Sequence, residues 1–178
     1  MKKLKLLEST KYKILFLLLL SFLVFATWQN GLENIYQKTL VSTTNVILKT
    51  VKRDTYIKIE KDQTNQTIFR VYTKINGKRG NYPQKSGAIH EPFIIILTWQ
   101  IFLFFVIDRK KAIHSTVTNI LSFFLFQVLF LIFLTGYYTS GFQKFIFDMM
   151  LDNFYIIALI LVIKDNIRYH IFLKNAGS

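Results

Sequence analysis

Two small groups of ionisable side chains are the residues of this sequence best suited to chemistry. His90 and Glu91 are adjacent and stand just ahead of a long apolar run. Asp148 and Asp152 are four positions apart, so they would share one face of a helix. If the helices that carry the two groups touch, one imidazole and three carboxylates could bind a divalent cation or relay a proton. In the alternative interpretation, Glu91 faces a helix N-terminus, where a carboxylate is favourable, and both aspartates stay hydrated near the membrane surface.

The spacing of these side chains matches no metal or catalytic motif. The segment His90-Glu91-Pro92 lacks the second histidine, four residues after the first, that the zinc motif H-E-x-x-H requires. The chain also has no cysteine, no Gly-rich phosphate loop and no serine set in a nucleophile elbow. We therefore predict a non-catalytic protein that uses no metal and no cofactor.

Two glutamines are candidates of a different kind. Gln100 and Gln127 each lie near the middle of an apolar run, far from any predicted loop. An amide buried in a membrane-spanning helix usually forms hydrogen bonds to a neighbouring helix, which makes both residues candidates for interhelical contacts. The alternative is a role in a transport pathway through the membrane.

The elements that must position these residues are long apolar blocks. Of the 178 residues, 52% are hydrophobic and 16% are aromatic, and the run Phe93–Ile107 is almost unbroken. The formal net charge is +13, and most of the lysines and arginines flank the apolar blocks. This pattern is typical of an integral membrane protein whose basic flanks contact the lipid bilayer. It does not indicate nucleic-acid binding, because the aromatic residues lie inside the apolar blocks.

The apolar blocks predict a membrane α-helical fold with four transmembrane helices, at residues 14–28, 87–107, 119–137 and 145–163. Basic flanks place both chain ends and the middle loop in the cytoplasm, in the segments 1–13, 108–118 and 164–178. Residues 138–144 would then form a short outer loop. The first apolar run could also be a cleaved signal peptide, since Val24-Phe25-Ala26 resembles a cleavage site. An uncleaved anchor agrees better with the three further spans.

The polar region 29–86 is predicted to be a small extracytoplasmic α+β domain between the first two spans. Leu32–Val51 has apolar residues at roughly helical spacing, which indicates an amphipathic helix. Thr55–Glu60 and Thr67–Ile75 alternate apolar and polar residues, which predicts a β-hairpin. Lys78–Ser86 is predicted to be a loop. A lone hairpin is marginally stable, and its open edge could accept a strand from a partner.

The order of these parts resembles the small membrane proteins associated with exosortases, particularly the type H systems. A basic start, a first span ending at Trp28, a helix-plus-hairpin segment and three closely spaced spans make up nearly the whole chain. Ahead of the second span, Gly87-Ala88-Ile89-His90-Glu91-Pro92-Phe93 keeps the proline of that family's Asn-Pro but not its asparagine. The resemblance implies an accessory subunit beside an exosortase, which is a multi-span enzyme that processes C-terminally tagged surface proteins.

The expected function is that of a non-catalytic accessory or assembly subunit in the bacterial cytoplasmic (inner) membrane, bound to a larger membrane-protein partner. Three alternatives stay open. One is an enzyme, which would need His90, Glu91 and Asp148 to converge. The layout also resembles the immunity proteins against pore-forming colicins, which are small, basic, four-span inner-membrane proteins. A transporter or channel subunit is the third alternative, and it would line a cavity with Asp148 and Asp152.

Overall fold

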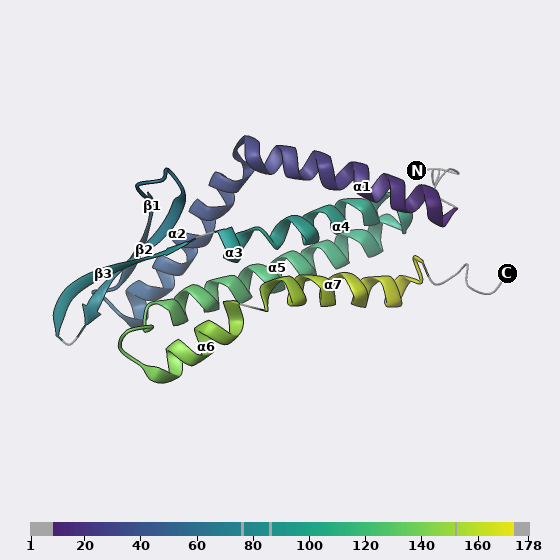
Figure 1. The fold of residues 1–178 in the computed structure, drawn as a ribbon. Helices are drawn as coiled ribbons and strands as arrows, with labels where there is room; N and C mark the ends of the chain where they lie inside the picture. The colour runs from purple at the N-terminus through teal and green to yellow at the C-terminus, as the bar shows by residue number, and fades with distance from the viewer. Residues whose placement is uncertain (1–8, 76, 86, 152, 173–178) are drawn as a thin grey trace. The chain divides into compact units, whose positions relative to one another are not determined.

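The computed structural model of the chain describes residues 9–75, 77–85, 87–151 and 153–172 (Figure 1). Asp152 and the outermost parts of the two basic chain ends, residues 1–8 and 173–178, lie outside these described residues. The chain is mostly helical (70%), with a small three-stranded sheet. It forms two compact units. The bundle unit consists of Met1–Asn30, Pro92–Phe123 and Tyr155–Ser178, and the sheet unit consists of Gly31–Glu91 and Phe124–Phe154.

The described part of the bundle unit is built from α1 (Thr10–Thr27), α4 (Phe93–Val106), the first half of α5 (Arg109–Leu134) and nearly all of α7 (Phe154–Tyr169). Figure 1 shows these helices running alongside one another. The buried core is apolar and comes from the helices and the chain next to them: Leu20, Trp99, Phe102, Leu103, Ala112 and Ile171. Lys13 Nζ donates to the carbonyl of Ile171 at 2.7 Å, which ties the start of α1 to the chain after α7.

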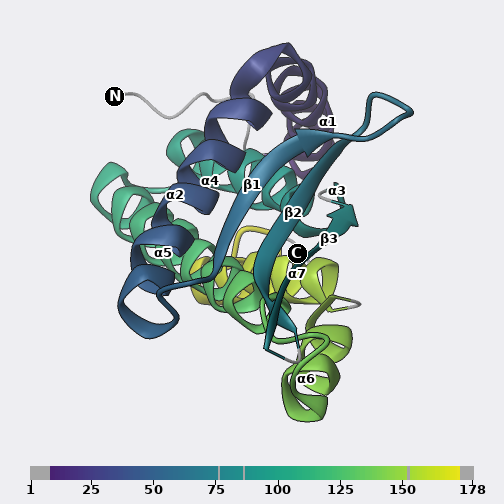
Figure 2. The same ribbon diagram turned by 90° about the vertical axis from the view of Figure 1, so that its left-hand side faces the viewer.

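The sheet unit begins at Gly31, inside a π-helical turn that covers Trp28–Leu32. Gly31 has a φ of 121°, a conformation that side chains other than glycine rarely adopt. The helix α2 (Glu33–Val51) follows, and then β1 (Tyr56–Lys61), β2 (Thr67–Ile75) and β3 (Lys78–Lys85) form an antiparallel sheet in the order β1-β2-β3 (Figure 2). The unit also contains α3 (Gly87–His90), the second half of α5 and α6 (Gly141–Leu151).

One face of the sheet forms the core of the sheet unit. Ile57, Val71 and Tyr82 lie opposite one another across the three strands, and all three are buried. The helix α2 packs against β1 and buries Leu40 and Leu48. The Tyr82 hydroxyl donates to the carbonyl of Leu134, so the sheet is also tied to α5. The hairpin that would be marginal alone is therefore supported by two helices.

Both edges of the sheet are partly blocked. Asn45 of α2 donates from Nδ2 to the carbonyl of Ile57 and accepts the Ile57 N–H with Oδ1, both at 2.8 Å. Its side chain thus occupies the place of a neighbouring strand at the outer edge of β1. The main-chain groups of Ile57 point away from β2, so those of its partner Val71 are expected to point towards β3 and to bond to Tyr82. Main-chain direction alternates along a strand, so the next residue, Pro83, faces the outer edge of β3. A proline presents no N–H to an added strand.

The third strand corrects the sequence-based prediction. Lys78–Ser86 was expected to be a loop, but Lys78–Lys85 forms β3. Gly80 and Pro83 obscure the strand pattern, and Pro83 is tolerated because it lies on an edge strand. The two strands that the sequence predicts are both present, and β1 is shifted by one residue from the predicted range.

Two described helices are long and apolar enough to cross a membrane, Thr10–Val51 and Arg109–Leu134. The helices Gly141–Leu151 and Phe154–Tyr169 meet the same criterion only when they are counted as one interrupted span. With 14 residues, α4 is about 21 Å long, which is shorter than the hydrocarbon core of about 30 Å. The predicted four-span topology is therefore not confirmed.

The helices divide the predicted segments between 87 and 137 differently, for reasons of local helix chemistry. The predicted span 87–107 is interrupted at Pro92, which has no N–H and separates α3 from α4. The predicted loop 108–118 is helical from Arg109 onwards, and the predicted span 119–137 is the rest of the same helix, which ends at Leu134. Lysine, arginine and alanine are good helix formers, so a basic segment can be helical and its charge does not by itself indicate a loop.

The predicted fourth span, 145–163, is also interrupted. The helix α6 begins earlier, at Gly141, and ends at Leu151. The Asn153 side chain donates to the carbonyl of Met149, a main-chain acceptor that the end of a helix leaves open. The helix α7 then continues to Tyr169, so residues predicted to be a cytoplasmic tail are helical.

The edge block by Asn45 predicts a local loss of protection in Asn45→Ala. The change removes two hydrogen bonds, each contributing about 1 kcal/mol, so amide exchange in β1 should become faster by about 30-fold. Hydrogen-exchange mass spectrometry of peptides that cover β1 measures this. Thr39→Ala is the control, because Thr39 is exposed on the same helix and bonds only to the carbonyl of Ile35. Equal protection of β1 in both variants would contradict the role of Asn45.

Candidate functional site

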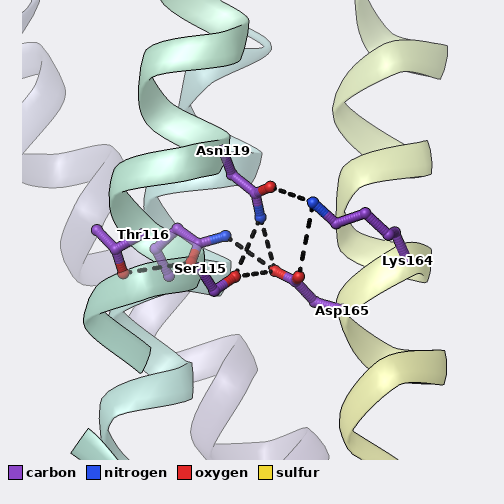
Figure 3. Close-up of polar contacts among 6 residues, drawn as sticks. Ser115, Thr116, Asn119, Lys164 and Asp165 are labelled. Atoms are coloured by element: carbon purple, nitrogen blue, oxygen red, sulfur yellow. Dashed lines mark hydrogen bonds and ion pairs between the residues drawn. The ribbon is translucent and has the colours of Figure 1, made fainter. Parts of the chain in front are cut away.

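A buried carboxylate is the centre of a polar site in the bundle unit (Figure 3). Asp165 of α7 is only 1% exposed. Its Oδ2 atom accepts hydrogen bonds from Ser115 Oγ and Asn119 Nδ2, both at 2.7 Å, and from Gln100 Nε2 at 3.2 Å. Ser115 and Asn119 are four residues apart on α5, so they present their polar groups from one helix face. The carboxylate therefore joins α4, α5 and α7.

Lys164 supplies the positive charge of this site. Its ammonium donates to Asn119 Oδ1 at 2.5 Å and lies 3.9 Å from Asp165 Oδ1. Within the described part of the chain, Asp165 Oδ1 accepts no hydrogen bond, so the ammonium balances it by charge alone. The Lys164 side chain is 42% exposed, so the positive charge stays partly hydrated while the negative charge is buried.

This arrangement of polar groups favours a structural role, which is to hold the three helices together. Three uncharged donors and one ammonium surround the Asp165 carboxylate. Lys164 thus occupies the position that a bound cation would take. Gln100 Oε1 also accepts a hydrogen bond from Thr116 Oγ1 at 3.3 Å, so both ends of this amide are used. Polar contacts of this kind fix which helices pack together among apolar surfaces that would otherwise be interchangeable.

The predicted site residue His90 lies in the sheet unit, in a second polar cluster. Its imidazole is fully buried, with Nε2 at 2.8 Å from Glu33 Oε1 and at 3.1 Å from Gln37 Nε2. Gln37 also donates to Glu33 at 2.9 Å. Both partners belong to α2, so the cluster joins α3 to α2. The imidazole is thus engaged by a carboxylate that the sequence did not indicate.

Two of the other predicted acidic residues are surface residues. Glu91 and Asp148 are exposed, and Asp152 lies outside the described residues. Among the residues that the structure describes, no group of three or more histidines, cysteines, aspartates or glutamates could hold a metal ion. The described residues therefore do not form the convergence of one imidazole and three carboxylates that the sequence allowed.

Gln127, the second predicted glutamine, bridges helices in the sheet unit. It accepts a hydrogen bond from the Tyr36 hydroxyl of α2 and donates to the carbonyl of Ile89 in α3. Both glutamines therefore contact other helices through both ends of their amides. Asp165 was not among the predicted residues, because the apolar run ends at Ile163 and the predicted helix ended with it. The sequence does contain an indication that the helix continues through Asp165. The charged pair Lys164-Asp165 is followed by apolar residues at helical spacing.

The solvent-facing side of the sheet carries a different set of side chains, which we name the tyrosine face: Tyr56, Lys58, Glu60, Arg70 and Tyr72. The two tyrosine rings stack at 4.8 Å with an interplanar angle of 11°. Lys58 Nζ lies 5.6 Å and 5.5 Å from their centroids, a cation–π arrangement. Glu60 accepts hydrogen bonds from the Tyr72 hydroxyl at 2.8 Å and from Arg70 Nε at 2.5 Å.

These contacts explain the electrostatics of the tyrosine face. The hydrogen bond from the Tyr72 hydroxyl, together with the Arg70 guanidinium, holds the pKa of the Glu60 carboxyl below its usual value of 4.5. The hydrogen bond and charge of Lys74 likewise lower the pKa of Asp54. Both carboxylates are therefore charged at neutral pH and bound within the sheet unit. The hydrogen bond to Glu60 orients the Tyr72 ring, on which Tyr56 stacks.

Comparisons with known proteins do not assign this geometry a function. No family model, curated protein or solved structure matches the chain. The two buried clusters and the tyrosine face must therefore be interpreted from their own contacts.

The Asp165 network predicts a graded loss of stability. Asp165→Ala removes the acceptor of three hydrogen bonds and leaves Lys164 without its counter-charge, which should cost about 2 kcal/mol or more. Asp165→Asn keeps one side-chain oxygen and should cost roughly half as much. Unfolding of the purified protein in detergent, followed by circular dichroism, measures both changes. A neutral Asp165→Ala would show that the network does not hold the helices together.

The Glu60 contacts predict a pH dependence of the tyrosine face. Because folding lowers the pKa of Glu60, its contribution to stability is full above pH 4.5 and is lost as the pH falls through the folded pKa below 4.5. Near-ultraviolet circular dichroism of the stacked tyrosines during thermal unfolding, at pH 7 and at pH 3.5, reports the loss. Glu60→Gln cannot titrate and should flatten this part of the pH dependence. An unchanged pH dependence in Glu60→Gln would reject the assignment.

Proposed function

We propose that this chain is a non-catalytic integral protein of the bacterial inner membrane, and that it acts as an accessory or assembly subunit for a larger membrane partner. Both chain ends would lie in the cytoplasm, and the sheet unit would lie outside. Two long apolar helices and the basic residues that flank the apolar blocks support this arrangement. The four-span topology belongs to the same proposal, with α4 as the shortest span.

The observation that carries the proposal is the tyrosine face. Tyrosine and arginine are enriched at the central contacts of protein interfaces. A tyrosine ring buries a large area at low entropic cost, because it has only two side-chain torsions to order. Here Lys58 and Glu60 hold the two rings in place before any partner arrives. Preorganisation of this kind reduces the ordering cost of binding.

The surroundings of the tyrosine face also suit a partner. An open hollow of about 230 Å³ borders the rings at one end and is lined in part by Arg53 and Arg79. A second hollow of about 680 Å³ lies beside Arg70 and is lined in part by Lys61 and Lys85. A partner that lies across the face would have a concave contact at each end.

Recognition through the face replaces recognition through an open strand edge. The side chain of Asn45 already occupies part of the β1 edge, and Pro83 lacks the N–H that an added strand would need on the β3 edge. Strand addition uses a continuous row of main-chain groups. We therefore place the partner on the tyrosine face and not beside the sheet.

The order of the parts along the chain supports a more specific partner class. A basic start, a first apolar helix, an α+β segment and further apolar helices resemble the accessory proteins of exosortase systems. The partner would then be a multi-span enzyme that processes tagged surface proteins. The tyrosine face would contact that enzyme or its substrate on the outer side of the membrane.

The proposal predicts a partner that depends on the tyrosine face. The tagged full-length chain, extracted from native membranes in mild detergent, should retain one membrane or surface protein at near-equal amounts. Tyr72→Ser or Lys58→Glu should lower the retained amount at least about tenfold, as expected for central interface residues. Quantitative mass spectrometry of the purified samples measures this.

The matched control is Lys49→Glu, which makes the same charge change on an exposed position of α2 in the same unit. This variant should retain the partner at the wild-type level. Equal retention in all variants would exclude the tyrosine face as the contact. A wild-type chain that purifies with no membrane or surface protein would overturn the accessory function.

A further inference from the structure

An open hollow in the bundle unit gathers basic side chains from two helices. It has a volume of about 400 Å³ and is lined by Lys110, Lys111 and His114 of α5 and by Arg168 and Tyr169 of α7. The Arg168 guanidinium lies 5.6 Å from the centroid of the Tyr169 ring. Among the described residues that line this hollow, none is acidic.

The charges of this hollow, on Lys110, Lys111 and Arg168, have no ion-pair partner among the described residues. The hollow is also at the N-terminal end of α5, where the helix dipole adds partial positive charge. The positive charges that line one hollow repel one another, so an anion bound between the two helices would lower their electrostatic energy.

The Asp165 network holds these charges together. Ser115 lies next to His114, and Asp165 lies one helical turn before Arg168. The hydrogen bond between Ser115 and Asp165 at 2.7 Å therefore fixes the spacing of the basic residues on the two helices. The positions of the two helices, and so the spacing of the basic residues on them, are set by this network.

We infer that this hollow binds the phosphate of an anionic phospholipid. An arginine fork and two lysine ammonium groups match the oxygens of a phosphate, and clusters of this kind at the ends of membrane helices bind acidic headgroups. Exposed apolar side chains continue the Lys110 and His114 face along α5, at Val117 and Leu121, which are 59% and 53% exposed. These side chains suit the acyl chains of a lipid and would offer nothing to free phosphate.

This site goes beyond the proposed accessory function and does not depend on it. The lipid would contact the bundle unit, whereas the proposed partner contacts the sheet unit. Loss of partner binding by the tyrosine-face variants would therefore leave lipid binding unchanged.

The test compares lipids on the full-length protein in detergent micelles. Native mass spectrometry should show more bound phosphatidylglycerol than phosphatidylcholine with the same acyl chains. Each basic side chain near an acidic headgroup contributes about fivefold to binding, so Arg168→Gln or Lys111→Gln should weaken phosphatidylglycerol binding about fivefold. The double variant should weaken it about 25-fold.

The control variant is Arg109→Gln, which removes one charge next to the hollow without removing a lining residue. If the lining residues make the site, it should weaken phosphatidylglycerol binding clearly less than Arg168→Gln does. An equal loss in Arg109→Gln and Arg168→Gln would show diffuse charge attraction and overturn the proposal. Displacement of the lipid by millimolar inorganic phosphate would show that the hollow binds free phosphate, and it would contradict the proposal of a phospholipid ligand. Circular dichroism of each variant checks that the helices are intact.

Discussion

A charged carboxylate buried among apolar helices is the constraint on which the bundle unit depends. Asp165 needs donors, because a buried charge without partners costs several kcal/mol. Ser115, Asn119 and Gln100 supply them from two other helices, and Lys164 supplies the balancing charge. Apolar packing alone would allow many arrangements of such helices, so this network selects one of them.

The Asp165 network also determines where side chains lie at the surface of the bundle unit. The network fixes α7 against the first part of α5, and the basic side chains beyond it then share one hollow. The sheet unit follows the same principle with different residues, since Asn45 binds the β1 edge and Glu60 orients the stacked tyrosines. In both units, polar contacts within the unit position a surface that we propose for recognition: a basic hollow on one unit and a tyrosine face on the other.

Parts of this structure could be predicted from the sequence, and others could not. The alternation in Thr67–Ile75 identified a strand, since a period of two is typical of a strand with one buried face. Lys78–Lys85 was missed because Gly80 and Pro83 interrupt the same signal. Gln100 was recognised as an interhelical residue, but its partner Asp165 was not, because pairing depends on which helices touch. Short-range patterns determine elements, whereas a site formed by three helices requires their packing.

The proposed orientation puts the tyrosine face on the outer side of the inner membrane and the basic hollow on its cytoplasmic side. The chain has no cysteine, so single cysteines can be introduced and labelled without background. Lys58→Cys and Arg168→Cys would be treated in intact cells with a maleimide that cannot cross the inner membrane, and then again after permeabilisation. We expect Lys58→Cys to react in intact cells and Arg168→Cys to react only after permeabilisation. Labelling of both positions from the same side would contradict this orientation.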